Sequence, residues 1–274
     1  TRFSQGIYSV VTKIVPIILS GGTGSRLWPV SRRMHPKPFI EVAGKSLLEQ
    51  ALERAALLAD EALIVTNQDH YFLTENLLKK VKKAPQVSYL LEPKGRNTAP
   101  AISQAVRHIQ KSYGDDAVCL VLAADHLISD NEAFEQAVSQ AVVQAQLGNL
   151  VVFGIRPTAP RTDYGYLEVV EAGDAPQHLR SFVEKPDRAK AEQYLAEGRY
   201  YWNSGMFCFT AGIMAKNITA HAADVWNASG KALERAQVET RITRFEEHSF
   251  IAQPNISIDY AVMEKANKIF MVPA

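Results

Sequence analysis

The chain has 274 residues, a formal net charge of +1 and 47% hydrophobic residues, which is typical of a globular protein with one large domain or two modest ones. The balanced charge argues against a general nucleic-acid binder, which would need a basic face across the domain. No apolar run approaches the length of about 20 residues that spans a bilayer. Residues 1–13 also lack the apolar core and cleavage site of a secretory signal peptide. We therefore expect a cytoplasmic protein without nucleic-acid or membrane partners.

Apolar runs alternate with amphipathic segments through the first half of the chain. The runs predict strands at 13–20, 62–66, 87–92, 117–125 and 150–155, and the amphipathic segments predict helices at 46–59, 69–82, 97–114 and 132–148. Strands that are apolar on both faces and alternate with helices are typical of a mostly parallel sheet covered by helices.

The rhythm changes after residue 156. Strands are predicted at 164–171, 178–185, 202–210 and 269–273, and helices at 187–198 and near 211–220, 230–238 and 257–266. No linker or repeat interrupts the chain, so we expect one continuous domain, 1–274. Its front half, 13–156, should bind a ligand at the carboxyl ends of the strands, and its back half, 157–274, should complete the cleft.

The two cysteines lie in apolar runs. Cys119 is part of "AVCLVLAA" and Cys208 of "MFCFT". We interpret them as buried free thiols, which indicates a reducing compartment. A disulfide between them is the alternative, and no His/Cys cluster has the spacing of a zinc site.

A glycine-rich segment follows the first predicted strand: "IILSGGTGSRLWPVSRRMHPKPF", residues 17–39. It fails the dinucleotide fingerprint because Leu27 occupies the third glycine position, and the later "GKS" fails the P-loop pattern because Phe39 replaces the upstream glycine. The first failure disfavours a dinucleotide-dependent oxidoreductase. A turn with solvated arginines remains the simplest alternative.

Charge favours a functional interpretation of this segment. Lys13, Arg26, Arg32, Arg33 and Lys37 carry five positive charges across 13–40, where no acidic residue occurs. Glycines let backbone N–H groups approach an anion, an arginine can fork onto phosphate oxygens, and the prolines beside Lys37 hold it on a stiff segment. The pattern indicates a polyphosphate ligand.

Three further segments carry candidate site residues. In "LEPKGRNTAPAI" (91–102), Glu92 could accept from the N–H groups of a base, while Asn97 and Thr98 could bond a ligand or cap the following helix. Asp125 ends a strand, where it could ligate Mg²⁺ or cap a turn. Asp259 could line a site or cap a helix.

The segment "LSGGTGSRLWPVSRRMHPKPF" strongly resembles the G-G-x-G-x-R-L-x-P…P-K-P signature of sugar-nucleotidyltransferases, also called nucleotide-sugar pyrophosphorylases. Its L-W-P-x-S-R form is similar to the branch that transfers a guanylyl group to mannose 1-phosphate. "EPKGRNTAPA", "LAADH", "TDYGYLEV", "SFVEKPD" and "YYWNSGMFCF" follow in the family's order. The resemblance covers nearly the whole chain from about residue 14.

The resemblance implies a fold, a reaction and a set of site residues. The fold would be a Rossmann-like three-layer α/β/α sandwich with a mostly parallel, mixed central sheet. The reaction would convert GTP and mannose 1-phosphate to GDP-mannose and diphosphate with Mg²⁺. The residues implied are Arg26 and Lys37 for catalysis, Leu19, Ser20, Gly21, Gly22, Gly24, Glu92, Asn97 and Thr98 for the nucleotide, Asp125 for the metal, and Gly165, Glu184, Lys185 and Asn203 for the sugar phosphate.

The sequence departs from the family pattern at its end. The family carries a second metal carboxylate in a W-x-D-x-G segment, and this sequence stops at Ala274 before it. We therefore expect the full protein to continue beyond this residue. The family form that it resembles is often fused to an isomerase domain at this end. We also expect a homo-oligomer. The alternatives are another sugar-1-phosphate nucleotidyltransferase, for example one using glucose 1-phosphate, and a non-catalytic regulatory subunit that binds nucleotide sugars.

Overall fold

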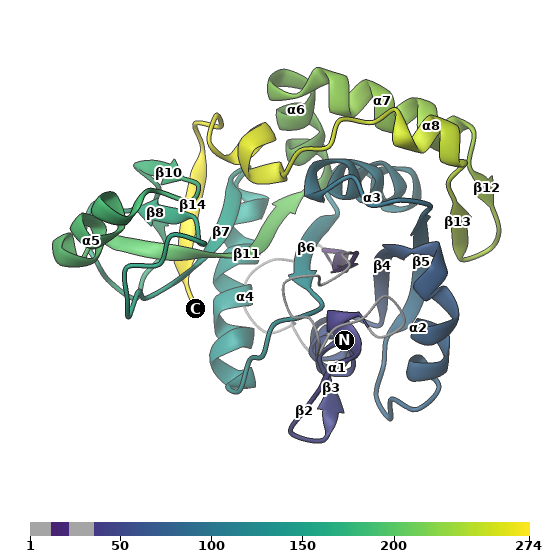
Figure 1. The fold of residues 1–274 in the computed structure, drawn as a ribbon, viewed down its shortest axis with the longest axis horizontal. Helices are drawn as coiled ribbons and strands as arrows, with labels where there is room; N and C mark the ends of the chain where they lie inside the picture. Colours follow the sequence, from purple (N-terminus) through teal and green to yellow (C-terminus); the bar gives the residue numbers. More distant parts are fainter. Residues whose placement is uncertain (1–11, 22–35) are drawn as a thin grey trace.

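A computed structural model of the chain describes residues 12–21 and 36–274. Within these ranges one large sheet gathers strands from both halves of the sequence (Figure 1). Its strand order is β12 (Gln237–Val238), β13 (Ile242–Arg244), β5 (Gln86–Glu92), β4 (Glu61–Asn67), β1 (Ile14–Ser20), β6 (Val118–Ala123), β11 (Tyr200–Thr210), β7 (Leu150–Ile155), β14 (Ile269–Pro273) and β9 (Gln177–His178).

The sheet is mixed and mostly parallel, as predicted. β1 pairs in parallel with β4 and β6, β5 with β4 and β13, and β14 with β7. β11 runs antiparallel between β6 and β7, and β12 and β9 are antiparallel at the two edges. The short strands β8 (Tyr166–Glu168) and β10 (Ser181–Val183) extend the sheet from β11.

Alternate side chains of each strand pack into different cores. Ile17 and Ile18 are both fully buried, but each belongs to a separate hydrophobic cluster. One cluster includes residues of α3 (Thr98–Tyr113), α6 (Ala211–His221) and α7 (Ala223–Glu234); the other includes residues of α1 (Leu47–Leu58) and α4 (Asn131–Gln146). Helices therefore cover both faces of the sheet, which confirms the three-layer α/β/α arrangement.

Several segments differ from the sequence-based prediction. A helix was expected over 257–266, but a π-helix forms at Asp259–Met263. A helix was expected over 230–238, but α7 ends at Glu234, since residues 237–238 pair with β13 instead. The expected strand 178–185 is divided into β9, which pairs with β14, and β10, which pairs with β8.

Smaller elements complete the described part of the chain. A hairpin of β2 (Glu41–Val42) and β3 (Lys45–Ser46) precedes α1, and α2 (Tyr71–Leu78) follows β4. α5 (Arg188–Glu197) is the helix predicted at 187–198, whereas α8 (Glu247–Ile251) and the 3₁₀ turns Lys37–Phe39 and Gln68–His70 were not predicted. Among the described helices, none has the length and apolarity needed to cross a membrane.

The topology brings several strand ends to one edge of the sheet. Parallel strands β1, β4, β5 and β6 all end at this edge. Because β11 runs in the opposite direction, its first residues lie here as well, and Asn203 pairs with Gly154 near the end of β7. Ligand sites of open α/β sheets lie outside the carboxyl ends of such strands.

Candidate functional site

A cavity of about 630 Å³ opens at this edge, beyond β6 and β7. Its volume is in the ordinary range of small-molecule sites. It is lined by Lys37, Asp125, His126, Leu127, Ile128, Ser129, Asp130, Ala133, Phe134, Ile155, Tyr164, Trp202, Asn203, Ser204, Met206 and Ala274. Three side chains predicted from separate motifs, Lys37, Asp125 and Asn203, therefore line one cavity.

Lys37 and Asp125 form an ion pair in this cavity. Lys37 Nζ lies 2.6 Å from Asp125 Oδ2, and each side chain is about one-third exposed (37% and 32%). Lys37 starts a 3₁₀ turn, and the prolines on either side of it, Pro36 and Pro38, are buried. Because the ring of proline fixes φ, the prolines hold the ammonium group at the end of β6, where a bound anion would compete for it with Asp125.

The backbone on either side of Asp125 is anchored. Ala124 N–H donates to the Leu19 carbonyl at 3.1 Å, which ties the end of β6 to β1. Arg54 Nη2 donates to the His126 carbonyl at 2.9 Å. Burial also lowers the pKa of His126, so at neutral pH this ring adds no positive charge beside the Asp125 carboxylate.

A second polar group forms where β8, β10 and β11 meet the π-helix. The Glu184 side chain is 7% exposed and pairs with Lys185. Glu184 Oε2 would lie only 2.6 Å from a Cβ atom placed on Gly165, so this glycine allows the carboxylate to approach the backbone. Lys185 has φ of +49°, which is uncommon for a residue with a side chain.

Asn203 joins this group to the cavity. Its N–H donates to the Gly165 carbonyl at 2.8 Å, and Asn203 Nδ2 donates to Asp259 Oδ1 at 3.0 Å. Burial, and then the nearby Glu184 carboxylate, raises the pKa of Asp259 to about 6. The four predicted sugar-phosphate residues Gly165, Glu184, Lys185 and Asn203 therefore lie together, and Asp259 belongs with them.

Glu92 lies on the opposite side, at the end of β5. It is 4% exposed, and burial raises its pKa to about 8. A Cβ atom on Gly21 would stand 3.4 Å from Glu92 Oε2, which places this carboxyl group beside the end of β1. Glu92 Oε1 and Ser20 Oγ are buried and have no hydrogen-bond partner within the described residues. Buried polar atoms of this kind are typical of positions that meet a ligand.

Asn97 and Thr98 already make hydrogen bonds within the described chain. The Asn97 side chain accepts from the Thr98 N–H at 2.9 Å and caps α3, with its backbone at φ of +68°. The Thr98 hydroxyl accepts from the Ile258 N–H at 2.8 Å. Thr98 thus connects the segment after Glu92 to the residue that precedes Asp259.

A family model for nucleotidyl transferases matches residues 15–247. The chain belongs to the nucleotidyl transferase family. The match includes Lys37, Glu92 and Asp125 as well as the group of Gly165, Glu184, Lys185 and Asn203, but not Asp259. It confirms the family resemblance and the enzyme class inferred from the motifs.

Proteins with known names are similar to this nucleotidyl transferase in sequence and in fold. It is 43% identical over 96% of its length to the xanthan biosynthesis protein XanB of Xanthomonas campestris, and 42% identical over 92% to a mannose-1-phosphate guanylyltransferase of Klebsiella pneumoniae. It covers 56% and 54% of these relatives, so it spans about half of their length. A solved structure described as a mannose-1-phosphate geranyltransferase of Thermus thermophilus matches with a TM-score of 0.81, 36% identity, and coverage of 96% of this chain and 74% of that one.

Another solved structure carries a different description. A protein of Helicobacter pylori described as mannose-6-phosphate isomerase matches with a TM-score of 0.83 and 34% identity, and the match covers 95% of the nucleotidyl transferase and 97% of the other chain. Both likenesses confirm the fold.

Part of the predicted site lies outside the described residues. Gly22, Gly24 and the predicted catalytic Arg26 belong to the segment 22–35, so their roles stay predictions. Leu19, Ser20 and Gly21 lie at the end of β1, where Ser20 accepts from Thr66 Oγ1 through its carbonyl at 3.1 Å. The roles of Lys37 and the other predicted residues, the division at residue 156 and the homo-oligomer likewise stay predictions.

Sequence reasoning missed two side chains that hold this site. Arg54 is 4% exposed although it is charged. Its signal was its position three residues after Ala51 and four before Leu58, on the apolar stripe of α1. Glu264 accepts from the Glu184 N–H at 3.0 Å. Nothing in its sequence context distinguishes it from a solvated glutamate.

Proposed function

We propose that this chain catalyses guanylyl transfer from GTP to α-D-mannose 1-phosphate, giving GDP-mannose and diphosphate. The observation that supports it most is the common cavity of Lys37, Asp125 and Asn203, which opens at the sheet edge where β5 also ends with Glu92. The names of the Klebsiella pneumoniae and Escherichia coli relatives support the choice of nucleotide and sugar.

The reaction needs no nucleophile from the protein. An oxygen of the sugar phosphate, ionised at neutral pH, attacks the α-phosphorus of GTP, the bond to the β-phosphate oxygen breaks, and diphosphate leaves in line. Cys119 and Cys208 are buried, which raises the pKa of both thiols, so neither supplies a thiolate. The protein's task is to hold two anions together and stabilise the charge of the transition state.

Among the described residues, Lys37 is the lysine that lines the cavity and would bind the phosphates. In the free chain its ammonium group is balanced by Asp125. Phosphate oxygens would take over this ammonium group and so release the Asp125 carboxylate. For the mannose 1-phosphate, Glu184 would accept hydrogen bonds from sugar hydroxyls, and Lys185 would bind the phosphate group. Asn203 would form a hydrogen bond with a further hydroxyl.

The residues fit a magnesium ion that is shared with the substrate. Mg²⁺ is usually held by one or two carboxylates together with phosphate oxygens, and Asp125 places one carboxylate in the cavity. No group of three or more His, Cys, Asp or Glu side chains within residues 12–21 and 36–274 could hold a metal alone. Asp125 would hold the ion, which would neutralise the negative charge of the triphosphate.

Glu92 would read the guanine. The N1–H and N2–H₂ groups of guanine form a donor pair that suits a carboxylate, whereas adenine has no such pair. Below about pH 8 the buried Glu92 is protonated in the free chain. Binding of guanine would therefore favour the ionised form and release a proton.

The proposal is tested by a diphosphate-release assay with GTP, ATP, UTP and dTTP against mannose 1-phosphate and glucose 1-phosphate. We expect the GTP and mannose 1-phosphate pair to give the highest kcat/KM. Lys37→Ala should reduce that value about 10²- to 10³-fold, since it removes a charge from the transition state. Lys216→Ala, at an exposed position of α6, should leave it unchanged. Preference for another pair, or an unaffected Lys37→Ala variant, would refute the proposal.

A further inference from the structure

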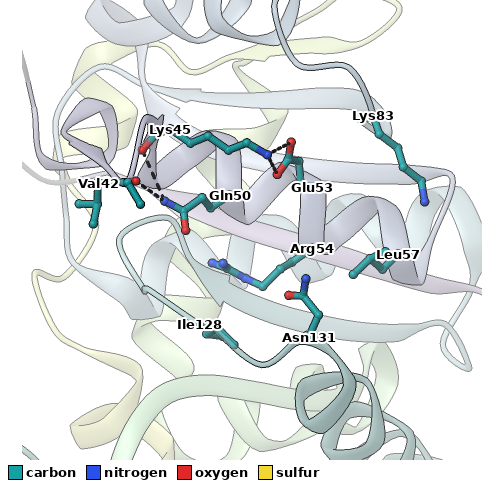
Figure 2. A pocket seen from close by; sticks show the side chains of 10 residues that line it. Val42, Lys45, Gln50, Glu53, Arg54, Leu57, Lys83, Ile128 and Asn131 are labelled. Atoms are coloured by element: carbon teal, nitrogen blue, oxygen red, sulfur yellow. Dashed lines mark hydrogen bonds and ion pairs between the residues drawn. The ribbon is translucent and has the colours of Figure 1, made fainter.

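A second cavity, of about 400 Å³, lies behind the segment that follows β6 (Figure 2). It is lined by Val42, Ala43, Lys45, Gln50, Glu53, Arg54, Leu57, Lys83, Ile128 and Asn131. Ile128 also lines the larger cavity. The segment 125–131 is therefore a wall shared by the two cavities, and nothing in the proposed reaction uses the second one.

The lining of the second cavity is positively charged. Lys45, Arg54 and Lys83 contribute three positive charges and Glu53 one negative charge, so the lining has a net charge of +2. The Glu53 carboxylate already forms an ion pair with Lys45, whose Nζ lies 2.7 Å from both of its oxygens. Among the lining residues of this cavity, all of which the structure describes, neither Arg54 nor Lys83 forms an ion pair.

Arg54 is the most constrained of these charges. It is 4% exposed, and its one hydrogen bond among the described residues, from Nη2, goes to the neutral His126 carbonyl. Burial lowers the pKa of Arg54, and the nearby Glu53 carboxylate offsets this cost only in part. A guanidinium group has five N–H donors. In Figure 2 the side chain extends along the cavity between Gln50 and Asn131.

We propose that this cavity is a binding site for a phosphate group, either free or on a small phosphomonoester. A guanidinium fork matches the oxygens of a phosphate, and a dianion would balance the net charge of +2 that the lining carries. The volume of about 400 Å³ leaves room for the organic part of a small ester. The site is separate from the cavity of Lys37 and Asp125, so both can be filled at once.

The location of this cavity would let a bound ligand influence the position of Asp125. Arg54 holds the His126 carbonyl, and His126 follows Asp125 directly in the chain. An anion on Arg54 compensates the buried charge and holds the guanidinium group against that carbonyl. Occupancy therefore stabilises the shared wall in the position seen here.

Equilibrium dialysis of the whole chain with inorganic phosphate, and in parallel with glycerol 3-phosphate, tests the site. Lys83→Ala should weaken binding about fivefold, since one of the positive charges of the lining is lost. The matched control, Lys82→Ala, removes an exposed neighbour that does not line the cavity and should change nothing. Arg54→Lys keeps the charge but loses the fork, and should weaken binding further.

Lys37→Ala separates this site from the larger cavity. We expect the binding that depends on Lys83 to survive Lys37→Ala. Tighter binding of the ester than of phosphate identifies an organic ligand, and equal binding identifies phosphate itself. If neither probe binds, or if binding responds to Lys37→Ala but not to Lys83→Ala, the proposal is wrong. Should Arg54→Lys fail to fold, the pair Lys83→Ala and Lys82→Ala still decides.

Discussion

The two sides of the proposed site are built in different ways. On the side of Gly165, Glu184, Lys185, Asn203 and Asp259, the polar groups bond one another before any ligand arrives. On the side of β1 and β5, Ser20 Oγ and Glu92 Oε1 are buried without a partner among the described residues. The first side is preorganised for hydroxyl groups at fixed positions, whereas the second bears a desolvation cost that a ligand's donors could relieve. Substitutions should therefore act mainly through geometry on the first side and through protonation on the second.

Among substitutions that compare the two sides, Gly165→Ala should give the largest effect. The added Cβ would lie 2.6 Å from Glu184 Oε2, so the buried carboxylate must move. We expect the KM for mannose 1-phosphate to rise about 5- to 100-fold, in line with the cost of overpacking, while GTP affinity is unchanged. Gly95→Ala is the control, because no described atom lies within 4 Å of the position that its added methyl group would take. Steady-state kinetics that show equal losses for both substrates would argue against a preorganised sugar side.

The nucleotide side should respond to pH. Since the pKa of Glu92 is raised to about 8, the free chain must lose a proton before the carboxylate can accept from guanine. GTP affinity should rise about tenfold per pH unit up to roughly pH 8 and then level off. Glu92→Gln should bind GTP more weakly and show no such slope. Isothermal titration in buffers of different ionisation enthalpy would also report the released proton, and a flat wild-type profile would contradict this role.

The hydrogen bond from the Ile258 N–H to the Thr98 hydroxyl, which joins the two sides, should contribute to stability. Thr98→Val removes the hydroxyl that accepts from the buried Ile258 N–H. The free energy of unfolding should fall by about 1–2 kcal/mol, because a backbone donor is left unsatisfied. Thr219→Val serves as the control, since Thr219 is exposed and its hydroxyl donates to the Ala215 carbonyl within α6, so no backbone N–H loses its partner. Urea unfolding of both variants measures the difference, and equal midpoints would show that the connection carries no stability.

Asp259→Asn should give the smallest effect. Its neutral amide would accept from Asn203 less strongly than a carboxylate does, so the KM for mannose 1-phosphate at pH 8 should rise about two- to threefold. Asp259 has a pKa of about 6, so below that pH the wild-type group is itself neutral. The gap between wild type and variant should therefore close at roughly pH 5, below that pKa. A gap that persists there would mean that the Asp259 charge is irrelevant.

The sequence carried most of the information about the sheet. Ile17 and Ile18 are apolar neighbours because each faces a different core, and such runs predict buried parallel strands. The insertion of β11 between β6 and β7 could not be predicted, since an apolar run does not reveal its pairing partner. The antiparallel direction of this strand is what brings Asn203 to the edge where Asp125 lies.

The candidate site was predictable where a motif fixes local chemistry. Lys37 stands between two prolines, and Asp125 lies in the turn that follows β6, so both positions could be proposed in advance. The place of Arg54 on the apolar stripe of α1 indicated its burial, but the roles of Arg54 and Glu264 could not be predicted, because they act through the backbone of residues 72 and 80 positions away. Asp259 was ambiguous for a related reason: a π-helix, rather than the expected α-helix, presents its carboxylate to Asn203.

The position of β13 has a consequence for how the chain matures. β5 is bordered on one side by β4, and within the described part of the chain residues 242–244 cover its other side. Until those residues leave the ribosome, β5 presents an open row of backbone donors and acceptors, which is a template for aggregation. Residues synthesised late therefore protect a strand synthesised early, and release of partial chains would be more hazardous for this protein than for one whose sheet closes in sequence order.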